Sequence, residues 1–521
     1  MPPSLILPLA FLVLLRLPSL FEPHWYTDEA GYANTAYLMA HGKVLYLTVW
    51  NNKPPLLFWI YQLALGGFGP SEFGLHLLSL VSEAAALAGV WRLGRAQLSS
   101  RGVWLATAMG ALLLGIPLFD GDLALPENFL IAFTVWAMVV ALASLSSEGA
   151  RRAAVLAALA GVLLGLACLI QQTALADAAA ACLFLLLARR RRPWLAAVVA
   201  GALTLAVVIA LAPFLLRAGV GNVFFFLVGS YFGYAGRSLA ANAADLIPRG
   251  LAIALLLFGV WRSRGWDSVS RLSLIWLAAV LLAYTLPNRP YLHFLLPAVP
   301  PAALCLARWS GLATFRRWPR LWPGARPLVV SVVISGGLWA VLLLGAAGTG
   351  SLFPGKLTAE YYPAFIARAT GLISSSALDR VFGTGPAAEG SAVAWIRVHR
   401  LSGSRAVVWS PDSWAYLLGD LHPVLPAAAI YVDQEWLGSD GLLARLEQAK
   451  PALILVTGKS PDQFGPIVPV LRAAYTEVDR VAGAQLWIRD AVALRLGRLE
   501  RAHDQSGRSR VQVRTGANAG G

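Results

Sequence analysis

Two neighbouring carboxylates, Asp28 and Glu29, lie in a polar, aromatic stretch that follows the first apolar segment of the chain. Tyr32, Ala36 and Met39 come after them at helical spacing, which predicts a short amphipathic helix on a membrane surface with both acids at its start. A carboxylate there can take the proton of an acceptor hydroxyl. It can equally serve as a helix cap, because the helix dipole favours anions at an N-terminus.

A second group of acids, Asp120, Asp122 and Glu127, stands between two later apolar segments. These carboxylates could orient a substrate or hold a divalent cation, because hard cations prefer carboxylate oxygens. Asp120 and Asp122 could equally form a solvated turn. The sequence shows no His and Cys cluster with the spacing of a zinc site.

Four cations, Lys53, Arg289, His293 and Arg16, could stabilise a phosphate leaving group. Three of them also have a structural interpretation. Arg16 could extend its head group to the membrane interface, and His293 could be a hydrogen-bonded core histidine. Arg289 could anchor a lipid head group.

The composition defines the surroundings in which these residues work. Of 521 residues, 58% are hydrophobic and only 13% are charged, whereas a soluble domain carries about 25% charged residues. Lipid must therefore solvate much of the chain, which excludes a soluble enzyme, a disordered protein and a disulfide scaffold. A net charge of +15 would suggest nucleic acid in a soluble protein, but Arg-rich cytoplasmic loops account for it in a membrane protein.

Apolar runs of sufficient length predict about eleven transmembrane helices. The loops between them alternate between Arg-rich loops, such as residues 189–192, and loops that hold most of the acids. By the positive-inside rule the N-terminus is cytoplasmic, and the candidate site residues lie on the outer face. The candidate spans are residues 4–21, 74–91, 103–119, 128–145, 153–170, 173–188, 194–216, 250–262, 272–286, 294–308 and 327–346.

The chain changes character after residue 346. Apolar runs at 406–409 and 453–456 indicate buried strands, and helix-like stretches alternate with them, which predicts a small α/β domain. The expected parts are a transmembrane domain (1–346) whose outer loop (22–73) carries the acidic motif, an extracytoplasmic α/β domain (347–497) and a disordered basic tail (498–521).

The motif Asp-Glu-x-x-Tyr-Ala from Asp28, followed by Lys-Pro-Pro-Leu from Lys53, resembles the polyprenyl-phosphate-dependent glycosyltransferases of the GT-C fold. The branches it resembles most are the aminoarabinose transferases of lipid A and the protein O-mannosyltransferases. Glu127 stands where this family places a second acid, and residues 165–174, which include Gln171 and Gln172, resemble its Lys/Gln turn. Residues 288–297 resemble its late Arg-x-x-x-His/Tyr loop. The chain departs from the aminoarabinose transferases at Asn52, where they carry an acid, and in having no Lys in the 171–172 turn.

The resemblance implies an integral membrane glycosyltransferase that moves a sugar from a polyprenyl-phosphate donor to a hydroxyl acceptor on the outer face of the cytoplasmic membrane, with inversion. It makes Asp28 the base, with Glu29 as neighbour or substitute. The implied donor-phosphate residues are Lys53, Arg289, His293 and Arg16, and the residues implied to orient the acceptor or sugar are Glu127, Asp122, Asp120, Gln172 and Tyr291.

No cofactor is required by this interpretation, and a divalent cation is left open. The expected partners are the lipid bilayer, the lipid-linked donor and a glycan, lipid or protein acceptor, with no nucleic acid, and a monomer is expected. The alternative function is a secondary transporter with carboxylate-coupled ions. Transporters concentrate such residues near the bilayer midplane, whereas these candidates gather in outer loops and at the mouths of spans, which favours an enzyme.

Overall fold

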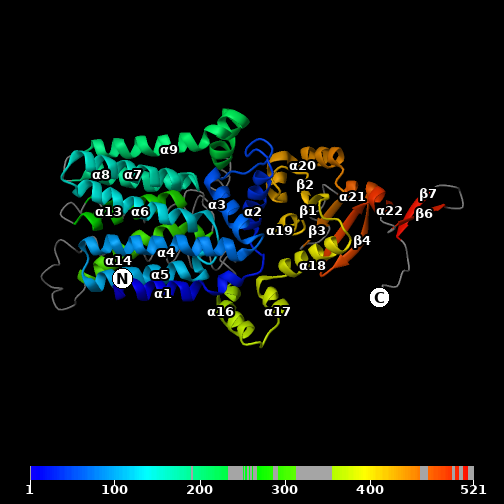
Figure 1. Ribbon diagram of the computed structural model, residues 1–521, viewed down its shortest axis with the longest axis horizontal. Coiled ribbons are helices and arrows are strands. Elements are labelled where there is room, and N and C mark those ends of the chain that lie inside the picture. The colour runs from blue at the N-terminus through cyan, green and yellow to red at the C-terminus, as the bar shows by residue number, and fades with distance from the viewer. Residues whose placement is uncertain are drawn as a thin grey trace. The chain divides into compact units, whose positions relative to one another are not determined.

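The computed structural model describes residues 2–188, 192–232, 267–285, 291–312, 355–457 and 468–495, together with single positions between 250 and 261 and the strands 499–503 and 509–513 (Figure 1). The chain divides into two compact units. Unit 1 holds Met1–Phe21, Asn52–Gly67 and Glu72–Glu360, and unit 2 holds Glu22–Asn51, Phe68–Ser71 and Tyr361–Gly521.

Unit 1 is a bundle of apolar helices whose long members run side by side (Figure 1). Short 3₁₀ or π turns interrupt the chain at η1 (Pro18–Phe21), η2 (Pro117–Phe119), η3 (Gln172–Ala174), η4 (Phe225–Gly229) and η7 (Leu292–Ala298). The helices are α1 (Pro3–Arg16), α3 (Pro55–Phe68), α4 (Glu72–Gln97), α5 (Ser100–Gly115), α6 (Pro126–Ser146), α7 (Ala150–Cys168), α8 (Leu175–Leu187), α9 (Trp194–Ala218), α10 (Val220–Phe224), α13 (Ser268–Thr285) and α14 (Val299–Leu312).

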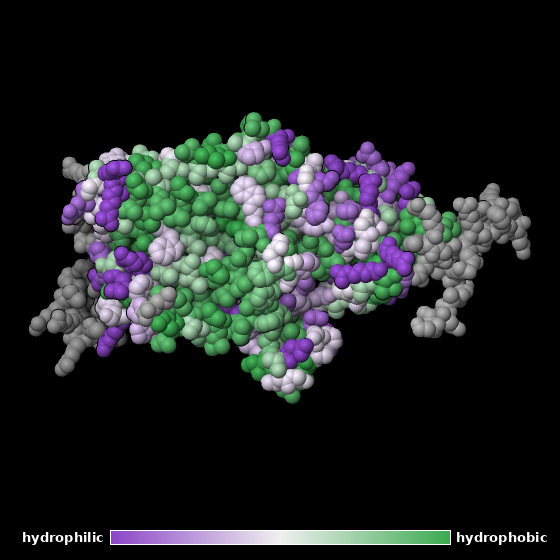
Figure 2. All heavy atoms as spheres, in the orientation of Figure 1, coloured by the Kyte–Doolittle hydropathy of each residue, from purple (hydrophilic) through white to green (hydrophobic). Residues whose placement is uncertain are grey.

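Five of the described helices are long and apolar enough to cross a membrane, namely the segment Pro3–Phe21, α4, α6, α7 and α9. Each coincides with a predicted span. Five shorter apolar helices accompany them, and the flank of unit 1 in view is covered by apolar side chains, with hydrophilic residues gathered at the end of the bundle (Figure 2). The chain is therefore a multi-pass membrane protein, as the composition predicted.

Only some of the about eleven predicted spans can be compared with the structure. The predicted span 327–346 and most of 250–262 lie outside the described residues. Helix α3 lies inside the predicted outer loop and was not counted as a span, because its 14 residues fall short of the roughly 20 that a span needs.

Helices α7 and α9 approach closely because glycines face the partner helix. A Cβ on Gly161 would lie 2.3 Å from the carbonyl oxygen of Val199, and one on Gly165 would lie 3.0 Å from Cβ of Ala206. Two glycines four residues apart on one helix face allow backbones to approach in the way that membrane helices use for van der Waals packing.

Unit 2 contains a five-stranded sheet in the order β2-β1-β3-β5-β4. Strand β1 is parallel to β2 and β3, while β5 is antiparallel to β3 and β4. The strands are β1 (Arg405–Trp409), β2 (His422–Pro423), β3 (Leu453–Val456), β4 (Tyr475–Val481) and β5 (Ala484–Arg489). The helices are α2 (Thr27–Ala40), α17 (Ser375–Asp379), α18 (Gly385–Val398), α19 (Trp414–Leu418), α20 (Ile430–Ala449), α21 (Val468–Ala474) and α22 (Asp490–Arg495), with a 3₁₀ turn at η9 (Arg380–Phe382). Helix α16 (Gly355–Ala369) begins in unit 1 and belongs to unit 2 from Tyr361.

The small α/β domain predicted from the sequence is confirmed, and β1 and β3 fall on the two predicted apolar runs. The tail was predicted to be disordered, but it contains an antiparallel hairpin of β6 (Leu499–His503) and β7 (Ser509–Val513). The tail composition, averaged over its whole length, concealed the short Val-Gln-Val run that forms part of β7.

The polar loop after the first apolar segment groups with the C-terminal α/β segment, whereas the sequence analysis placed it with the transmembrane domain. Leu38 and Val49 from this loop lie in the same core cluster as Val408, Leu455 and Leu486 of the sheet. Helix α2 forms as predicted, but it is not an amphipathic surface helix, because residues 29–36 along it are all buried. Its many Ala and Gly residues let it pack on several sides.

Candidate functional site

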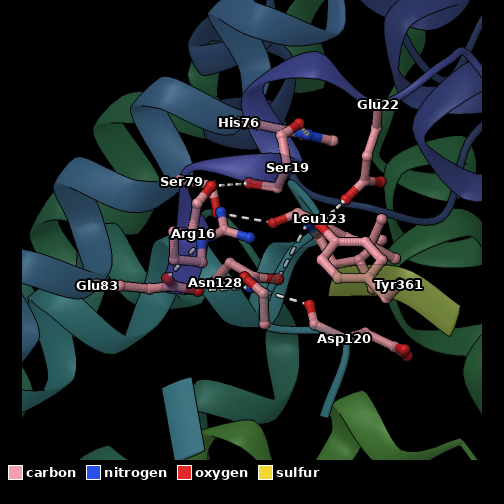
Figure 3. A network of polar contacts seen from close by, with 12 residues as sticks. Arg16, Ser19, Glu22, His76, Ser79, Glu83, Asp120, Leu123, Asn128 and Tyr361 are labelled. Atoms are coloured by element: carbon pink, nitrogen blue, oxygen red, sulfur yellow. Dashed lines mark hydrogen bonds and ion pairs between the residues drawn. The ribbon is translucent and has the colours of Figure 1, made fainter. Parts of the chain in front are cut away.

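The C-terminal end of α1 places a cation inside unit 1. Arg16 is 0% exposed, and its Nε lies 3.1 Å from Oε2 of the equally buried Glu83 on α4. Its Nη2 donates to Oγ of Ser79 at 2.8 Å, and Asn128 donates to the other oxygen of Glu83 at 2.8 Å (Figure 3). A buried charge needs such a partner, so Glu83 compensates the charge of Arg16.

Asn128, in the first turn of α6, fixes the loop that carries the second acidic group. Its Nδ2 also donates to the carbonyl oxygens of Asp120 and Gly121 at 3.2 and 3.3 Å, and its Oδ1 accepts from the backbone N–H of Leu125 at 3.1 Å. Ser79 donates to the carbonyl oxygen of Leu123 at 2.7 Å (Figure 3). The loop before α6 is therefore held to the same buried ion pair.

Asp120 and His293, 173 residues apart in the chain, meet in unit 1. Nδ1 of His293 lies 2.8 Å from Oδ2 of Asp120, and both side chains are buried. The ring of Tyr291 stacks on His293 with centroids 5.5 Å apart, and Tyr291 itself is 46% exposed. A carboxylate on Nδ1 fixes the orientation of the imidazole.

The other two acids of this loop are buried as well. Asp122 and Glu127 are each 1% exposed. Glu127 lies in the first turn of α6, where the helix dipole stabilises a carboxylate. Its Oε1 has no hydrogen-bond partner among the residues that the structure describes, so a bound hydroxyl could supply one.

Gln172 supports the segment that carries Lys53. Its Nε2 donates to the carbonyl oxygens of Asn52 at 2.7 Å and Leu227 at 3.0 Å. The turn between α7 and α8 thereby holds the backbone directly before Lys53. The sequence analysis placed Gln172 beside the sugar, and the structure shows its amide nitrogen engaged with backbone. Arg289 lies outside the described residues.

The acids of the first motif lie in unit 2, in the first turn of α2. Asp28 is half-buried, and its Oδ1 accepts from the hydroxyl of Tyr431 at 3.2 Å. Glu29 is 0% exposed. The N-cap residue is Tyr26, which makes no side-chain capping bond, so neither acid is the N-cap. The first residue of the helix, Thr27, donates to Oδ1 of Asp412 at 2.6 Å.

Sequence reasoning missed Glu83, Asn128, Tyr431 and Asp412. For Glu83 a signal existed, because a carboxylate inside an apolar helix requires a partner. Tyr431 and Asp412 gave none, since they are 403 and 385 residues away from the residues they contact.

Residues 52–216 match the family model described as dolichyl-phosphate-mannose-protein mannosyltransferase. This matched stretch, called the mannosyltransferase-family domain from here on, spans less than half of the chain. The mannosyltransferase-family domain includes Lys53, Asp120, Asp122, Glu127 and Gln172, whereas Asp28 and His293 lie outside it. No curated protein matches the chain.

Two crystal structures of ArnT from Cupriavidus metallidurans, one bound to undecaprenyl phosphate and one in the apo state, are similar to the whole chain. Each has a TM-score of 0.55 at 16% identity and covers 92% of this chain and 97% of that chain. The oligosaccharyltransferase AglB from Archaeoglobus fulgidus has a TM-score of 0.49 at 13% identity, covering 98% of this chain and 74% of that chain. The GT-C fold expected from the sequence is confirmed by the likeness to ArnT.

Proposed function

We propose that this protein is a membrane glycosyltransferase that moves a sugar from a polyprenyl-phosphate donor to an acceptor hydroxyl on the outer face of the cytoplasmic membrane. The observation that carries the proposal is the mannosyltransferase-family domain over residues 52–216. The fold shared with ArnT, one structure of which is bound to undecaprenyl phosphate, supports a lipid-phosphate donor. A transporter, the alternative from the sequence, is disfavoured by the same domain.

In the proposed reaction the acceptor oxygen attacks the anomeric carbon of the sugar. The bond between that carbon and the phosphate oxygen breaks, and polyprenyl phosphate leaves as an anion. The acceptor proton passes to a carboxylate base. One attack opposite the leaving group inverts the anomeric centre.

We assign the base to Asp28. Asp28 is only half-buried, whereas Glu29 is 0% exposed, so Asp28 is the acid that an acceptor hydroxyl can approach. The bond from Tyr431 engages Oδ1 of Asp28, and Oδ2 is the oxygen proposed to take the proton. Glu29 then serves as a neighbour within the first turn of α2.

We assign stabilisation of the leaving phosphate to Lys53 and His293, together with Arg289 from the sequence motif. The carboxylate of Asp120, 2.8 Å from Nδ1, fixes the orientation of the His293 ring. Arg16 is a weaker candidate, because Glu83 already compensates its charge. We assign Arg16 to the structure of the bundle.

We assign the binding of the acceptor or sugar hydroxyls to Glu127, whose Oε1 lacks a partner among the described residues. We assign the same role to Asp122 and Tyr291. The carboxylates of Asp122 and Glu127 also offer the oxygens that a hard cation prefers. Transfer measured before and after EDTA treatment decides whether such an ion takes part.

The test is transfer by the purified full-length protein in lipid nanodiscs. A panel of polyprenyl-phosphate sugars, each labelled in the sugar, is offered with a mixture of membrane lipid and peptide acceptors. The expected result is release of polyprenyl phosphate with one donor and none with an Asp28→Asn control. No release with any donor, combined with proton-coupled solute uptake in proteoliposomes, would refute the proposal in favour of the transporter.

A further inference from the structure

Helix α2 is fastened to the α/β part of unit 2 along one face. Thr27 donates to Asp412 at 2.6 Å, Asn34 donates to the carbonyl oxygen of Ser413 at 2.8 Å, and Tyr37 donates to Asp420 at 2.8 Å. Positions 27, 34 and 37 share a face of a helix with 3.6 residues per turn. Asp28 is rotated about the helix axis by about 100° from Thr27, so it does not lie on this hydrogen-bonded face.

Hydrogen bonds hold the loop that contacts the start of α2. Residues 410–413 follow β1, and Thr457 follows β3, so parallel pairing brings both to one edge of the sheet. Thr457 donates to Oγ of Ser410 at 2.5 Å, and the same Oγ accepts from the backbone N–H of Asp412 at 3.1 Å. From β1 the chain continues to β2 at one side of the sheet, and from β3 it continues to β4 at the other side. This is the switch point where open α/β sheets bind ligands, and here α2 packs against it.

The carboxylate of Asp412 also lies close to the start of α18. Its second oxygen, Oδ2, lies where a Cβ on Gly385 would approach it to 2.7 Å. Gly385 is the first residue of α18, and the N-terminus of a helix stabilises an anion. One oxygen of Asp412 therefore accepts from Thr27 while the other lies against the start of α18.

We propose that Asp412 is a positioning residue for the base, acting through Thr27 on the first turn of α2 and so on the carboxylate of Asp28. The inference rests on the proposed function and deepens it. A first turn leaves backbone N–H groups without helical partners and frays unless it is capped. Tyr26 makes no side-chain cap, and the bond between Thr27 and Asp412 supplies the restraint that a cap would give.

Loss of the hydrogen bond between Thr27 and Asp412 is expected to lower kcat and to leave substrate binding unchanged. A misplacement of a catalytic group by about 1 Å costs on the order of 100-fold in rate. Removal of the Thr27 hydroxyl therefore lowers kcat by about 10- to 100-fold and leaves KM for donor and acceptor close to wild type, since no substrate contact is lost.

The experiment compares three ways of breaking this bond with one matched control. Thr27→Val removes the donor, Asp412→Ala removes the acceptor, and Gly385→Ala displaces the acceptor carboxylate without touching α2. Tyr37→Phe is the control, because it removes a bond of similar length to Asp420 at the other end of the same helix. Thr27→Ser keeps the hydroxyl and is expected to restore kcat.

Two readouts are taken from the full-length protein in nanodiscs, kcat and KM for transfer and hydrogen–deuterium exchange of the peptide that contains the first turn of α2. The expected result is a fall in kcat and faster exchange in the three variants, with neither change in Tyr37→Phe. The Thr27→Val and Asp412→Ala double variant should be no slower than either single variant.

Unchanged exchange at this turn in Thr27→Val overturns the inference whatever the activity. An equal loss of kcat in Tyr37→Phe, or a rise in KM that accounts for the lost rate, also overturns it. Absence of transfer by the wild-type protein is instead a failure of the proposed function, and the exchange measurement still tests the positioning of α2.

Discussion

The buried pair of Arg16 and Glu83 permits a sharp test of what the cation at the end of α1 does. Both side chains are 0% exposed, and their charged atoms are 3.1 Å apart. Glu83→Gln leaves the guanidinium of Arg16 buried without a counter-charge, which costs about 3–5 kcal/mol of unfolding free energy. Arg16→Met should cost a similar amount, since it leaves the carboxylate of Glu83 alone with Asn128.

The double variant, Arg16→Met with Glu83→Gln, removes both charges together. Replacing a whole buried pair with uncharged residues of similar volume is often neutral or stabilising, so we expect the double variant to recover most of the stability lost by either single variant. The coupling energy between the two sites should therefore be about 3 kcal/mol or more. The assay is equilibrium unfolding in mixed micelles, with KM for the donor measured in parallel.

Stability and donor binding separate the two roles considered for Arg16. A structural role predicts a double variant with near wild-type stability and near wild-type KM for the donor. A phosphate-binding role predicts that KM rises in every variant that lacks Arg16, the double variant included. Loss of less than about 1 kcal/mol in Glu83→Gln would refute the view that Glu83 compensates the buried charge of Arg16.

Four further outcomes are expected. Asp28→Asn should lower kcat by about 100- to 10,000-fold with unchanged expression; near-normal transfer would remove Asp28 from the base role. Lys53→Ala should lower kcat/KM for the donor by about 100- to 1000-fold, measured at saturating acceptor, and an unchanged value moves the phosphate site elsewhere. Gly161→Ala should destabilise the bundle by about 1–3 kcal/mol, because its Cβ would lie 2.3 Å from the Val199 carbonyl oxygen, whereas Gly201→Ala, with open space around its Cβ, should not. Burial raises the pKa of Asp433 to about 7, so the folded state holds a proton that the unfolded chain releases near pH 4; stability should fall by about 4 kcal/mol as the pH rises from about 4 to about 7, and Asp433→Asn should flatten that part of the profile.

Periodicity and length were enough to predict the elements that depend on local sequence. The long spans of α4, α6, α7 and α9, and the strands β1 and β3, follow from apolar runs that any stretch of chain displays by itself. Helix α3 escaped because 14 residues do not reach the length of a span, and the burial of α2 escaped because its partners are elsewhere in the chain.

The candidate site was predictable as a set of residue types but not as a set of contacts. Asp28, Lys53, Glu127 and His293 stood out by chemistry and motif. Their partners did not, because a hydrogen bond between residues 173 or 403 positions apart leaves no local trace in one sequence. The pairing of His293 with Asp120 is the clearest case, since the sequence analysis gave the two residues separate roles.

The hydrogen bond between α2 and the loop after β1 has a consequence for the order in which the protein folds during translation. Thr27 and Asp412 are 385 positions apart, so at about 5–20 residues per second the ribosome adds Asp412 roughly 20–80 s after Thr27. Throughout that interval the helix that carries Asp28 has no loop to hold its first turn. A chain that stops after residue 218 but before residue 412 therefore carries every membrane helix of the mannosyltransferase-family domain and still lacks the hydrogen bond from Thr27 to Asp412. The C-terminal α/β segment thus supplies a contact to a helix that was translated long before it. The first turn that carries the proposed base gains this contact only after Asp412 has been added.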